Sequence, residues 1–491
     1  MVQETAPRTA RMAVPCRPMD TDLAIVLDRA AAVPLAAQIH GALRQAILAG
    51  QLAAGARLPS WRDLAAQLGV ARGTVRVAYE RLMDEQLVVG LGAAGTRVAR
   101  WPVPGTATVP PPAETPPLPA FFHDFEAPPL AFQMGVPAQD AFPATLWSRI
   151  LARGARAAAL APVGYPDPRG HAELRREITA YLAISRGIQC TPAQVLVTNG
   201  YAGAVNLAVR ALGLEGKAAW MEEPGFPLTR MALMLAGMAP VPVPVDAQGL
   251  DVAAGAAVAP GAALAVVTPG QQAPLGMPLS LARRVALLDW ARRSGAWVLE
   301  DDYLSELQLA GRAVPALAAV DHAAGGEARV LHAGTFSKTI SPALRLGFLV
   351  VPATLAARFG DVAACLAPAP AAPVQRAVAA FLAEGHYLRH LRRMKRLYAA
   401  RRALLLQALD GLLPVRATAG LSVVVSLPPG ARDLDIANQA LAFGMAPVPL
   451  SPWYAAQGAD QAGLLLGVTN LNDRRLVADC RRLADLVARF G

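Results

Sequence analysis

Apolar residues at helical spacing define a first region of the chain, residues 34–100. Three stretches carry such a pattern, with apolar side chains at Leu35, Ile39, Leu43 and Ile47, then at Leu64 and Leu68, then at Val75, Tyr79 and Leu82. The spacing predicts three amphipathic helices. An apolar run at 87–89, a glycine-rich tip and the pair Arg97-Val98 then predict a small β-hairpin.

Short apolar runs alternate with helical patterns from residue 121 onward. The runs lie at 195–198, 218–221, 241–245, 264–268, 297–301, 330–332 and 347–351. Buried strands joined by crossover helices form parallel sheets, so the alternation predicts a large α/β domain, 121–491, around a largely parallel, doubly wound sheet. A long helix at about 373–409, strands at 421–427 and 464–468 and a last helix at about 472–489 predict a smaller C-terminal α/β subdomain, about 370–491.

Composition separates these regions and limits the class of protein. Residues 101–120 are rich in proline and predict an extended linker, and residues 1–33 are expected to form an N-terminal tail. Apolar residues make up 54% of the chain, but no uninterrupted apolar run is long enough for a membrane span, and no secretory signal is visible. The four cysteines lie far apart, and the seven histidines show no metal-ligand spacing. We therefore expect a cytoplasmic protein without a metal site.

Charge gives the first indication of a partner. The formal net charge of +10 suits a polyanion. On the third predicted helix, Arg72, Thr74 and Arg76 face away from the apolar stripe, and a helix of this kind fits the major groove of DNA. Arg62 is placed for a backbone phosphate, and the hairpin tip around Gly95 is small enough to approach a sugar–phosphate edge. On charge alone, a solvated helix face explains these arginines equally well.

Three motifs in this region carry more information than charge. They read LPSWRDLA at 58–65, LGVARGTV at 68–75 and AYERL at 78–82. Together they resemble the GntR family of bacterial transcription regulators. The resemblance implies a small α+β winged helix-turn-helix that binds double-stranded DNA, with contacts from Arg62, Arg72, Thr74 and Arg76 and with Gly95 and Thr96 in the wing. Gly73 departs from the family, whose members usually carry a polar residue there.

Lysine is scarce enough to narrow the search for amine chemistry in the large domain. The only lysines are Lys217, Lys338 and Lys395. Lys338 follows a predicted strand directly, at the edge of the sheet where ligands bind in doubly wound folds, and a lysine there can form a Schiff base with an aldehyde cofactor. The other two are expected to face solvent.

Polar residues at the ends of other predicted strands could contact the other groups of an aldehyde cofactor that carries a pyridine ring and a phosphate. A carboxylate of the pair Asp301-Asp302 would face a pyridine nitrogen, and the Tyr303 hydroxyl would bond a ring oxygen. Thr198-Asn199-Gly200 leads into a helix whose free N–H groups favour a phosphate. The phosphate cup would be completed by Thr335, Ser337 and Arg345.

Four longer stretches identify the family that this chemistry resembles. They are GYPDPRGHAELRREITAYLAISR at 164–186, MEEPGFP at 221–227, LEDDYLSE at 299–306 and AGTFSKTISPALRLGFLVV at 333–351. These stretches resemble fold-type I aminotransferases, and more narrowly the aminotransferase-like half of MocR-type regulators, a branch of the GntR family. The resemblance implies a pyridoxal 5′-phosphate (PLP) dependent transferase-like fold over residues 121–491.

The same resemblance assigns roles to individual residues. Lys338 would form the Schiff base with PLP, Asp301 rather than Asp302 would pair with the pyridine nitrogen, Tyr303 would bond the ring hydroxyl, and Phe226 would stack on the ring. The phosphate would be held by the backbone of Gly200 and Tyr201 and by Thr335, Ser337 and Arg345. Tyr165 would reach the phosphate of a second subunit, which implies a head-to-tail homodimer.

Two positions depart from the aminotransferase pattern. The stretch 270–276 reads GQQAPLG where members read something like SHQYPTG. Leu465 stands where aminotransferases place the arginine that clamps the α-carboxylate of an amino acid. An ordinary amino acid substrate is therefore disfavoured, and an effector without a carboxylate, another arginine as clamp, or PLP itself as effector remain open. The basic stretch 386–402 is either a solvated helix face or an additional DNA contact.

These observations predict a PLP-dependent transcriptional regulator that senses a small amine or PLP itself. Two winged helix-turn-helix units on one dimer would bind paired half-sites of an operator. An effector amine that displaces Lys338 would bias a two-state arrangement of the DNA-binding arms. Two alternatives remain: an active aminotransferase with a DNA-binding appendage, and a cofactor-free repressor that uses the large domain only for dimerisation.

Overall fold

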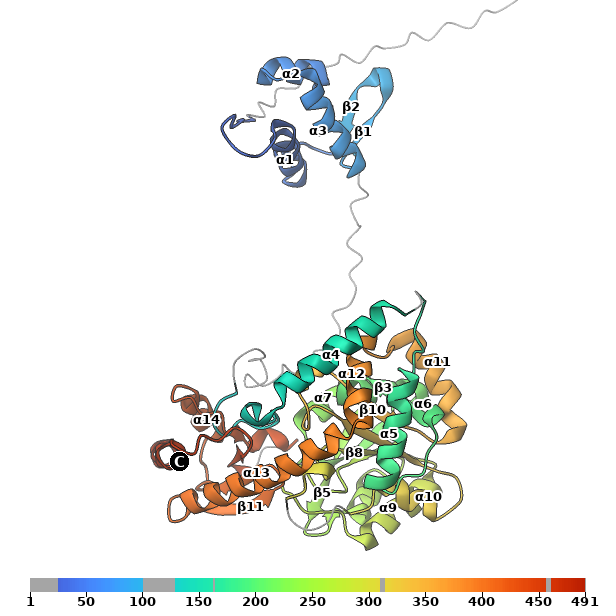
Figure 1. Cartoon of the computed structure of the whole chain (residues 1–491), viewed down its shortest axis with the longest axis vertical. Helices are drawn as coiled ribbons and strands as arrows, with labels where there is room; N and C mark the ends of the chain where they lie inside the picture. The colour runs from blue at the N-terminus through green and yellow to red at the C-terminus, as the bar shows by residue number, and fades with distance from the viewer. Residues whose placement is uncertain (1–24, 100–128, 162–163, 310–313, 456–460, 491) are drawn as a thin grey trace, which may run out of the picture. The chain divides into compact units, whose positions relative to one another are not determined.

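The computed structural model describes residues 25–99, 129–161, 164–309, 314–455 and 461–490. The chain divides into two units, residues 1–113 and 114–491 (Figure 1). The predicted linker and most of the predicted tail lie outside the described residues. Within the described part, no helix is long and apolar enough to cross a membrane.

The first unit contains the three helices and the hairpin that its sequence predicts. They are α1 (Leu35–Leu48), α2 (Trp61–Leu68), α3 (Arg72–Asp84), β1 (Val88–Gly90) and β2 (Thr96–Val98). The Ser60 hydroxyl caps α2 by accepting from the Asp63 N–H, and Gly69 ends the helix in the left-handed conformation, at φ 62°. The predicted apolar stripes meet in one core, where the Tyr79 hydroxyl donates to the Pro59 carbonyl at 2.9 Å.

The large unit is built on an eight-stranded sheet in the order β3-β10-β9-β8-β7-β4-β5-β6. The strands are β3 (Val195–Thr198), β4 (Ala218–Glu223), β5 (Ala239–Asp246), β6 (Gly249–Leu250), β7 (Leu264–Val267), β8 (Trp297–Asp302), β9 (Val330–Thr335) and β10 (Gly347–Val350). All seven predicted runs are strands, and the pairs from β9 across to β5 are parallel.

The sheet is more mixed than the sequence predicts. Strand β10 runs antiparallel to both of its neighbours, β3 and β9, and the short β6 pairs antiparallel with β5. The connection from β9 to β10, residues 336–346, contains only a short 3-10 helix. A crossover that returns the chain parallel needs a longer segment, usually a full α-helix, so β10 can only run back along β9.

Helices cover both faces of this sheet. They are α4 (Ala144–Ala159), α5 (Ala172–Ser185), α6 (Gly200–Leu212), α7 (Pro227–Leu235), α8 (Val252–Val258), α9 (Leu281–Ser294), α10 (Leu317–Ala323), α11 (Ala356–Leu366) and α12 (Ala372–Ala383). Alternate strand residues pack to opposite sides: Leu196 and Leu349 contact the cluster formed with α6 and α11, whereas Val197 and Val350 contact that formed with α5.

The C-terminal subdomain is an antiparallel sheet with helices packed on it. Its sheet, in the order β11-β12-β14-β13, contains β11 (Val415–Ala419), β12 (Ser422–Ser426), β13 (Val448–Pro449) and β14 (Gly463–Gly467), with helices α13 (His386–Leu409), α14 (Asp433–Leu441) and α15 (Leu476–Phe490). The single helix expected at 373–409 is wrong: α12 and α13 are separate because Gly385 takes φ 69° between them.

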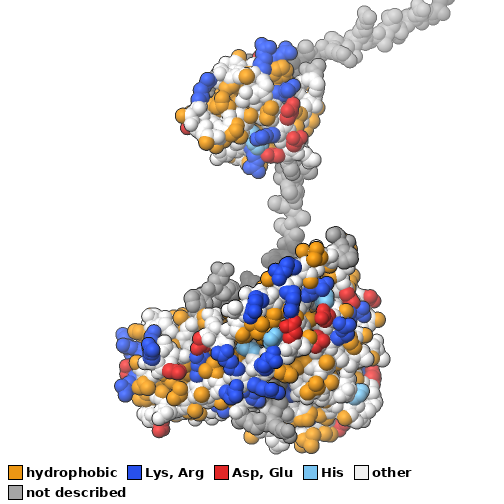
Figure 2. All heavy atoms as spheres, in the orientation of Figure 1, with side chains coloured by type: hydrophobic (Ala, Val, Ile, Leu, Met, Phe, Trp, Pro, Cys, Tyr) orange, Lys and Arg blue, Asp and Glu red, His pale blue; other side chains and the backbone are white. Residues whose placement is uncertain are grey.

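The basic stretch at 386–402 forms most of α13 and has two faces. Its buried face includes Tyr387, Met394, Tyr398 and Arg401, whereas most of its other arginines are exposed. Figure 2 shows basic side chains spread over this side of the large unit. The exposed arginines therefore remain available to either predicted role, but Arg401 belongs to the interior.

Candidate functional site

Lys338 lies just beyond the carboxyl end of β9, as its sequence position predicts. Its Nζ donates to the Gly135 carbonyl at 3.2 Å. A Cβ added at Gly135 would lie 2.8 Å from that nitrogen, and Gly135 has φ 84°, so only glycine allows this approach. Desolvation lowers the pKa of Lys338, while the Asp301 carboxylate acts in the opposite direction. The amine is thus biased toward the neutral, nucleophilic form.

The last three residues of β8 all carry carboxylates, and each one makes different contacts. Glu300 accepts from the N–H groups that begin α10 and contacts His332 Nδ1 at 3.0 Å. Asp302 forms a buried ion pair with Arg186 Nε at 2.6 Å. Asp301 lies between them in sequence and therefore points to the other face of the strand. Asp302 is thus committed to the Arg186 ion pair.

Asp301 occupies a buried polar pocket. Burial and the charges of Asp302 and Glu222 raise its pKa to about 8, although a hydrogen bond from the Tyr201 hydroxyl and the Lys338 charge offset part of the effect. A cationic partner, such as a protonated ring nitrogen, would restore the charged carboxylate. The Asp301 environment therefore fits the group that pairs with the pyridine of PLP.

Sequence reasoning missed Glu222 as a component of this site. This side chain ends β4 and accepts from the Thr268 N–H at 3.1 Å and the Thr268 hydroxyl at 2.5 Å. Burial raises its pKa to about 7. The available signal was the pair Glu222-Glu223 at the end of an apolar strand, within a motif that was used only for family resemblance.

The residues predicted to hold a phosphate lie around the beginning of α6. Gly200 starts the helix at φ 70°, and a Cβ there would lie 3.5 Å from Arg345 Nη2. The Thr335 hydroxyl accepts from the Ser337 N–H at 3.2 Å, and the two hydroxyl oxygens are 3.0 Å apart. A helix N-terminus, a guanidinium and two hydroxyls form a donor set suited to phosphate.

Two predicted residues behave differently from the others. The Tyr201 hydroxyl contacts Asp301 and the Thr229 hydroxyl, which is 3.2 Å away. Tyr201 therefore places its side chain beside Asp301, where the pyridine ring is expected, while its backbone N–H belongs to the first turn of α6. Tyr165 is fully exposed, and a single chain does not bring it to Lys338. Its predicted role depends on a second subunit.

An apolar wall adjoins the polar groups. Phe226 lies 5.5 Å from Trp453 between ring centroids. Leu465 is fully buried in the same cluster, which also includes Met134 and Tyr303. Met134 precedes Gly135, the acceptor for Lys338, so this wall lies beside the amine. The position where aminotransferases carry a clamping arginine is therefore apolar here.

The unusual stretch 270–276 is used mainly to hold its own loop. Gln272 Nε2 donates to the carbonyls of Pro224, at 2.7 Å, and Ala273, at 2.8 Å, while its oxygen accepts from the Leu275 N–H. A Cβ at Gly420 would lie 2.0 Å from Gln271 Nε2, so β11 and β12 turn closely over this loop. Across the described residues, His, Cys, Asp and Glu form no group of three that suits a metal ion.

In the first unit, the predicted DNA contacts lie on α2, α3 and the wing. Arg72 and Arg76 are exposed and Thr74 is half-buried; Arg76 is 3.6 Å from Glu80. The Arg62 guanidinium lies over the Trp61 ring, 4.9 Å from its centroid. These side chains are directed away from the core of the unit.

The wing contains a further cation that sequence reasoning missed. Gly95 has φ 84°, and a Cβ there would lie 3.0 Å from Arg57 Nε. Arg57 is exposed and pairs with Arg97 by an isolated β-bridge, so it joins the wing from the segment before α2. The signal was a cation immediately before the first GntR motif.

Comparisons with known proteins agree with both halves. Family models described as "Aminotransferase class I and II" and "Bacterial regulatory proteins, gntR family" match residues 150–442 and 35–98. The α-aminoadipate aminotransferase LysN of Thermus thermophilus is 27% identical, with a TM-score of 0.66, and covers 74% of this chain and 92% of its own. An archaeal alanine:glyoxylate aminotransferase has a TM-score of 0.67 at 24% identity.

Curated relatives contain both halves. The probable rhizopine catabolism regulatory protein MocR of Rhizobium meliloti is 36% identical over 92% of this chain and 93% of its own length. The pyridoxine biosynthesis regulator PdxR of Corynebacterium glutamicum is 30% identical over 96% of this chain and all of its own. TauR of Rhodobacter capsulatus is 34% identical over 74% of this chain and 78% of its own.

Fold and site together define a class: a winged helix-turn-helix joined to a fold-type I, aminotransferase-like body, as predicted from the sequence. Within that class, the chain belongs to the MocR-type regulators of the GntR family.

The raised pKa of Asp301 predicts a pH-dependent stability. In the cofactor-free protein, the folded carboxyl holds its proton up to about pH 8, whereas the unfolded one releases it near pH 4. Its contribution to the free energy of unfolding is therefore full below pH 4 and is lost as the pH rises to about 8. Asp301→Asn should accordingly be more stable than the parent protein at pH 9, by about 1 kcal/mol or more, but not at pH 5. Urea unfolding at both pH values measures the difference.

Asp302→Asn is the matched control for this experiment. It leaves the buried Arg186 without its charged partner and should lower stability at both pH values. An Asp301→Asn effect of equal size at pH 5 and pH 9 would contradict the assignment of the raised pKa.

Proposed function

We propose that this protein is a PLP-dependent transcriptional regulator that binds operator DNA as a head-to-tail homodimer and responds to a small amine or to PLP itself. The observation that carries the proposal is the half-buried Lys338 amine at the sheet edge shared with Asp301, in a chain that also has a GntR-type winged helix-turn-helix. A regulator that binds operator DNA would act in the cytoplasm. PLP supplies an aldehyde that condenses reversibly with primary amines.

The residues of this chain divide the binding of PLP among three regions. The phosphate would be held by the N-terminus of α6 with Arg345, Thr335 and Ser337. Asp301 would keep the ring nitrogen protonated, with Tyr303 at the ring hydroxyl and Phe226 stacked on the ring. Lys338 is held in place by the Gly135 carbonyl and can accept or release a proton at Nζ.

Regulation is a better account of this site than steady transamination. Repeated turnover of an amino acid requires a residue that binds its carboxylate. Leu465, the residue at the position of the clamping arginine, is buried among apolar groups. Arg230, which contacts residues of that wall, donates to the carbonyls of Trp453 and Tyr454. An amine without a carboxylate therefore suits the wall best.

The first prediction concerns Lys338. With PLP added, the purified protein should absorb visible light, and reduction with borohydride should fix the cofactor to the peptide that contains Lys338. Lys338→Ala should lose both signals, whereas Lys217→Ala, a change in an exposed turn, should keep them. Mass spectrometry after reduction locates the adduct; labelled Lys217 or Lys395 would overturn the assignment.

The second prediction concerns DNA. Arg72→Ala should weaken operator binding by about tenfold and reduce its salt dependence, because one charged contact is lost. Its visible spectrum with PLP should not change. Arg44→Ala is the control, since Arg44 lies on α1 and forms an ion pair with Glu85 at 2.9 Å. Equal affinity and salt dependence for Arg72→Ala and the parent protein would rule out α3 as the recognition helix.

The third prediction concerns the effector. The visible spectrum of the PLP-loaded protein should respond to 2-phenylethylamine at concentrations at least about tenfold lower than to phenylalanine, because the apolar wall gives no partner to a carboxylate. Leu465→Arg should reduce or reverse this preference, and the volume-conserving Leu465→Met should retain it. Equal responses of the parent protein to both compounds would contradict the role given to the wall.

A further inference from the structure

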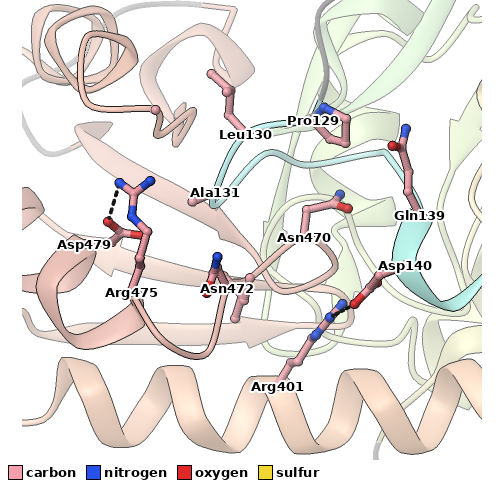
Figure 3. Close-up of a pocket in the computed structure, with 12 residues that line it drawn as sticks. Pro129, Leu130, Ala131, Gln139, Asp140, Arg401, Asn470, Asn472, Arg475 and Asp479 are labelled. Carbon is pink, nitrogen blue, oxygen red and sulfur yellow. Dashed lines mark hydrogen bonds and ion pairs between the residues drawn. The ribbon is translucent and has the colours of Figure 1, made fainter.

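A second pocket of about 410 Å³ lies in the large unit (Figure 3). It is formed by α13, the loop after β14, the beginning of α15 and the segment 129–140. Polar side chains dominate its lining, among them Asp140, Arg401, Asn470, Arg475 and Asp479. None of the residues assigned to PLP lines it, so the proposed cofactor site does not account for this pocket.

One wall of the pocket presents a carboxylate. Arg401 is buried, and its guanidinium contacts Asp140 Oδ2 at 2.6 Å and donates to the Thr469 carbonyl. The Asp140 side chain lines the pocket and is 66% exposed. The Nε of Arg401 is buried and has no partner among the described residues.

The opposite wall presents a guanidinium. Arg475 is 3.2 Å from Asp479, one turn later on α15, but its side chain remains 58% exposed whereas that of Asp479 is 9% exposed. Figure 3 shows Asp140 and Arg475 on opposite sides of the pocket, with Asn470 and Asn472 between them. The pocket thus has an exposed carboxylate, paired with Arg401, at one side and an exposed guanidinium, paired with Asp479, at the other, with amides in the middle.

The segment 129–140 connects this pocket to the Lys338 amine. Leu130 and Ala131 line the pocket at its beginning, and Gln139 and Asp140 line it at its end. Between them, the chain reaches Gly135, whose carbonyl accepts from Lys338. A ligand that moves either end of the segment therefore acts on a backbone that touches the amine.

Side chains of the pocket also fix the middle of the segment. The Val136 carbonyl accepts from the Thr469 hydroxyl at 2.6 Å and from Asn470 Nδ2 at 2.9 Å. Phe132 is held at φ 64°, a conformation that a bulky residue rarely adopts, and its carbonyl accepts from the Gly467 N–H at 2.7 Å. Hydrogen bonds thus fix the segment 129–140, which has a strained backbone at Phe132. Asn470 both lines the pocket and contacts this segment.

We propose that this pocket binds a small zwitterion, with its ammonium group at Asp140 and its carboxylate at Arg475, and that binding alters the surroundings of Lys338 through the segment 129–140. The ligand would not react with the lysine. It would be a second signal, distinct from the amine or PLP sensed at Lys338.

The test uses zwitterions that cannot condense with an aldehyde. N,N-dimethylglycine, 3-(dimethylamino)propanoate and 4-(dimethylamino)butanoate are tertiary amines that differ only in the separation of their charges. Titration calorimetry of the full chain without added PLP should show one site per chain for at least one of them. Asp140→Asn and Arg475→Gln should each weaken binding by about tenfold, the loss of one charge-assisted hydrogen bond.

Arg432→Gln is the control, because Arg432 forms a comparable exposed ion pair with Asp435, at 2.9 Å, outside the pocket. It should bind the probe as the parent protein does, and thermal melting of all three variants should show that they fold. No binding of any probe at millimolar concentration, or binding that survives both pocket variants, overturns the site.

The coupling is read in the PLP-loaded protein. The bound probe should shift the visible absorption or the PLP affinity of the parent protein, with no shift in Asp140→Asn. Binding without either change overturns the coupling and leaves the pocket as a simple ligand site. A protein that takes up no PLP refutes the proposed function, while the calorimetry still decides whether the pocket binds a zwitterion.

Discussion

The alternation of side chains along β8 is the constraint on which the large unit depends. Glu300 and Asp302 face one side, where the α10 N-terminus, His332 and Arg186 compensate their burial. Asp301 faces the other side, where the compensation is incomplete and its pKa is raised. Burial without a full partner is costly in a stable fold and is typical of a functional position.

The desolvation that raises the pKa of Asp301 also lowers that of Lys338. One desolvated site therefore holds a carboxyl group that gains from a cationic ring nitrogen and an amine whose charged form is disfavoured by burial. Glu222, held by Thr268, adds a further negative group to the same site. The parts of the site fit PLP as a set, and the apolar wall around Leu465 adjoins them.

Periodicity located most of the elements but not their directions. Apolar spacing located the three helices of the first unit and seven of the eight strands of the large sheet, since burial imposes those patterns on the sequence, but it missed β6 and, in the subdomain, β11, β13 and α14. It could not show that β10 runs backward, because a buried strand has the same pattern in either direction, or that Gly385 separates α12 from α13. Motif resemblance indicated the site residues, but the partner of the Tyr201 hydroxyl and the burial of Glu222 depend on contacts between distant strands.

The segment 129–140 shows the same limit most clearly. It has no periodic pattern, so nothing in its sequence predicted that it contacts Lys338. Its position follows from hydrogen bonds to Gly444, Gly467, Thr469 and Asn470, all far along the chain. Phe132 and Ala138 of the segment are also buried in the main core of the large unit, so apolar packing and hydrogen bonds together fix its path. The segment is the first described part of the large unit along the chain, and residues 121–128 separate it in sequence from the proline-rich stretch that follows the DNA-binding unit.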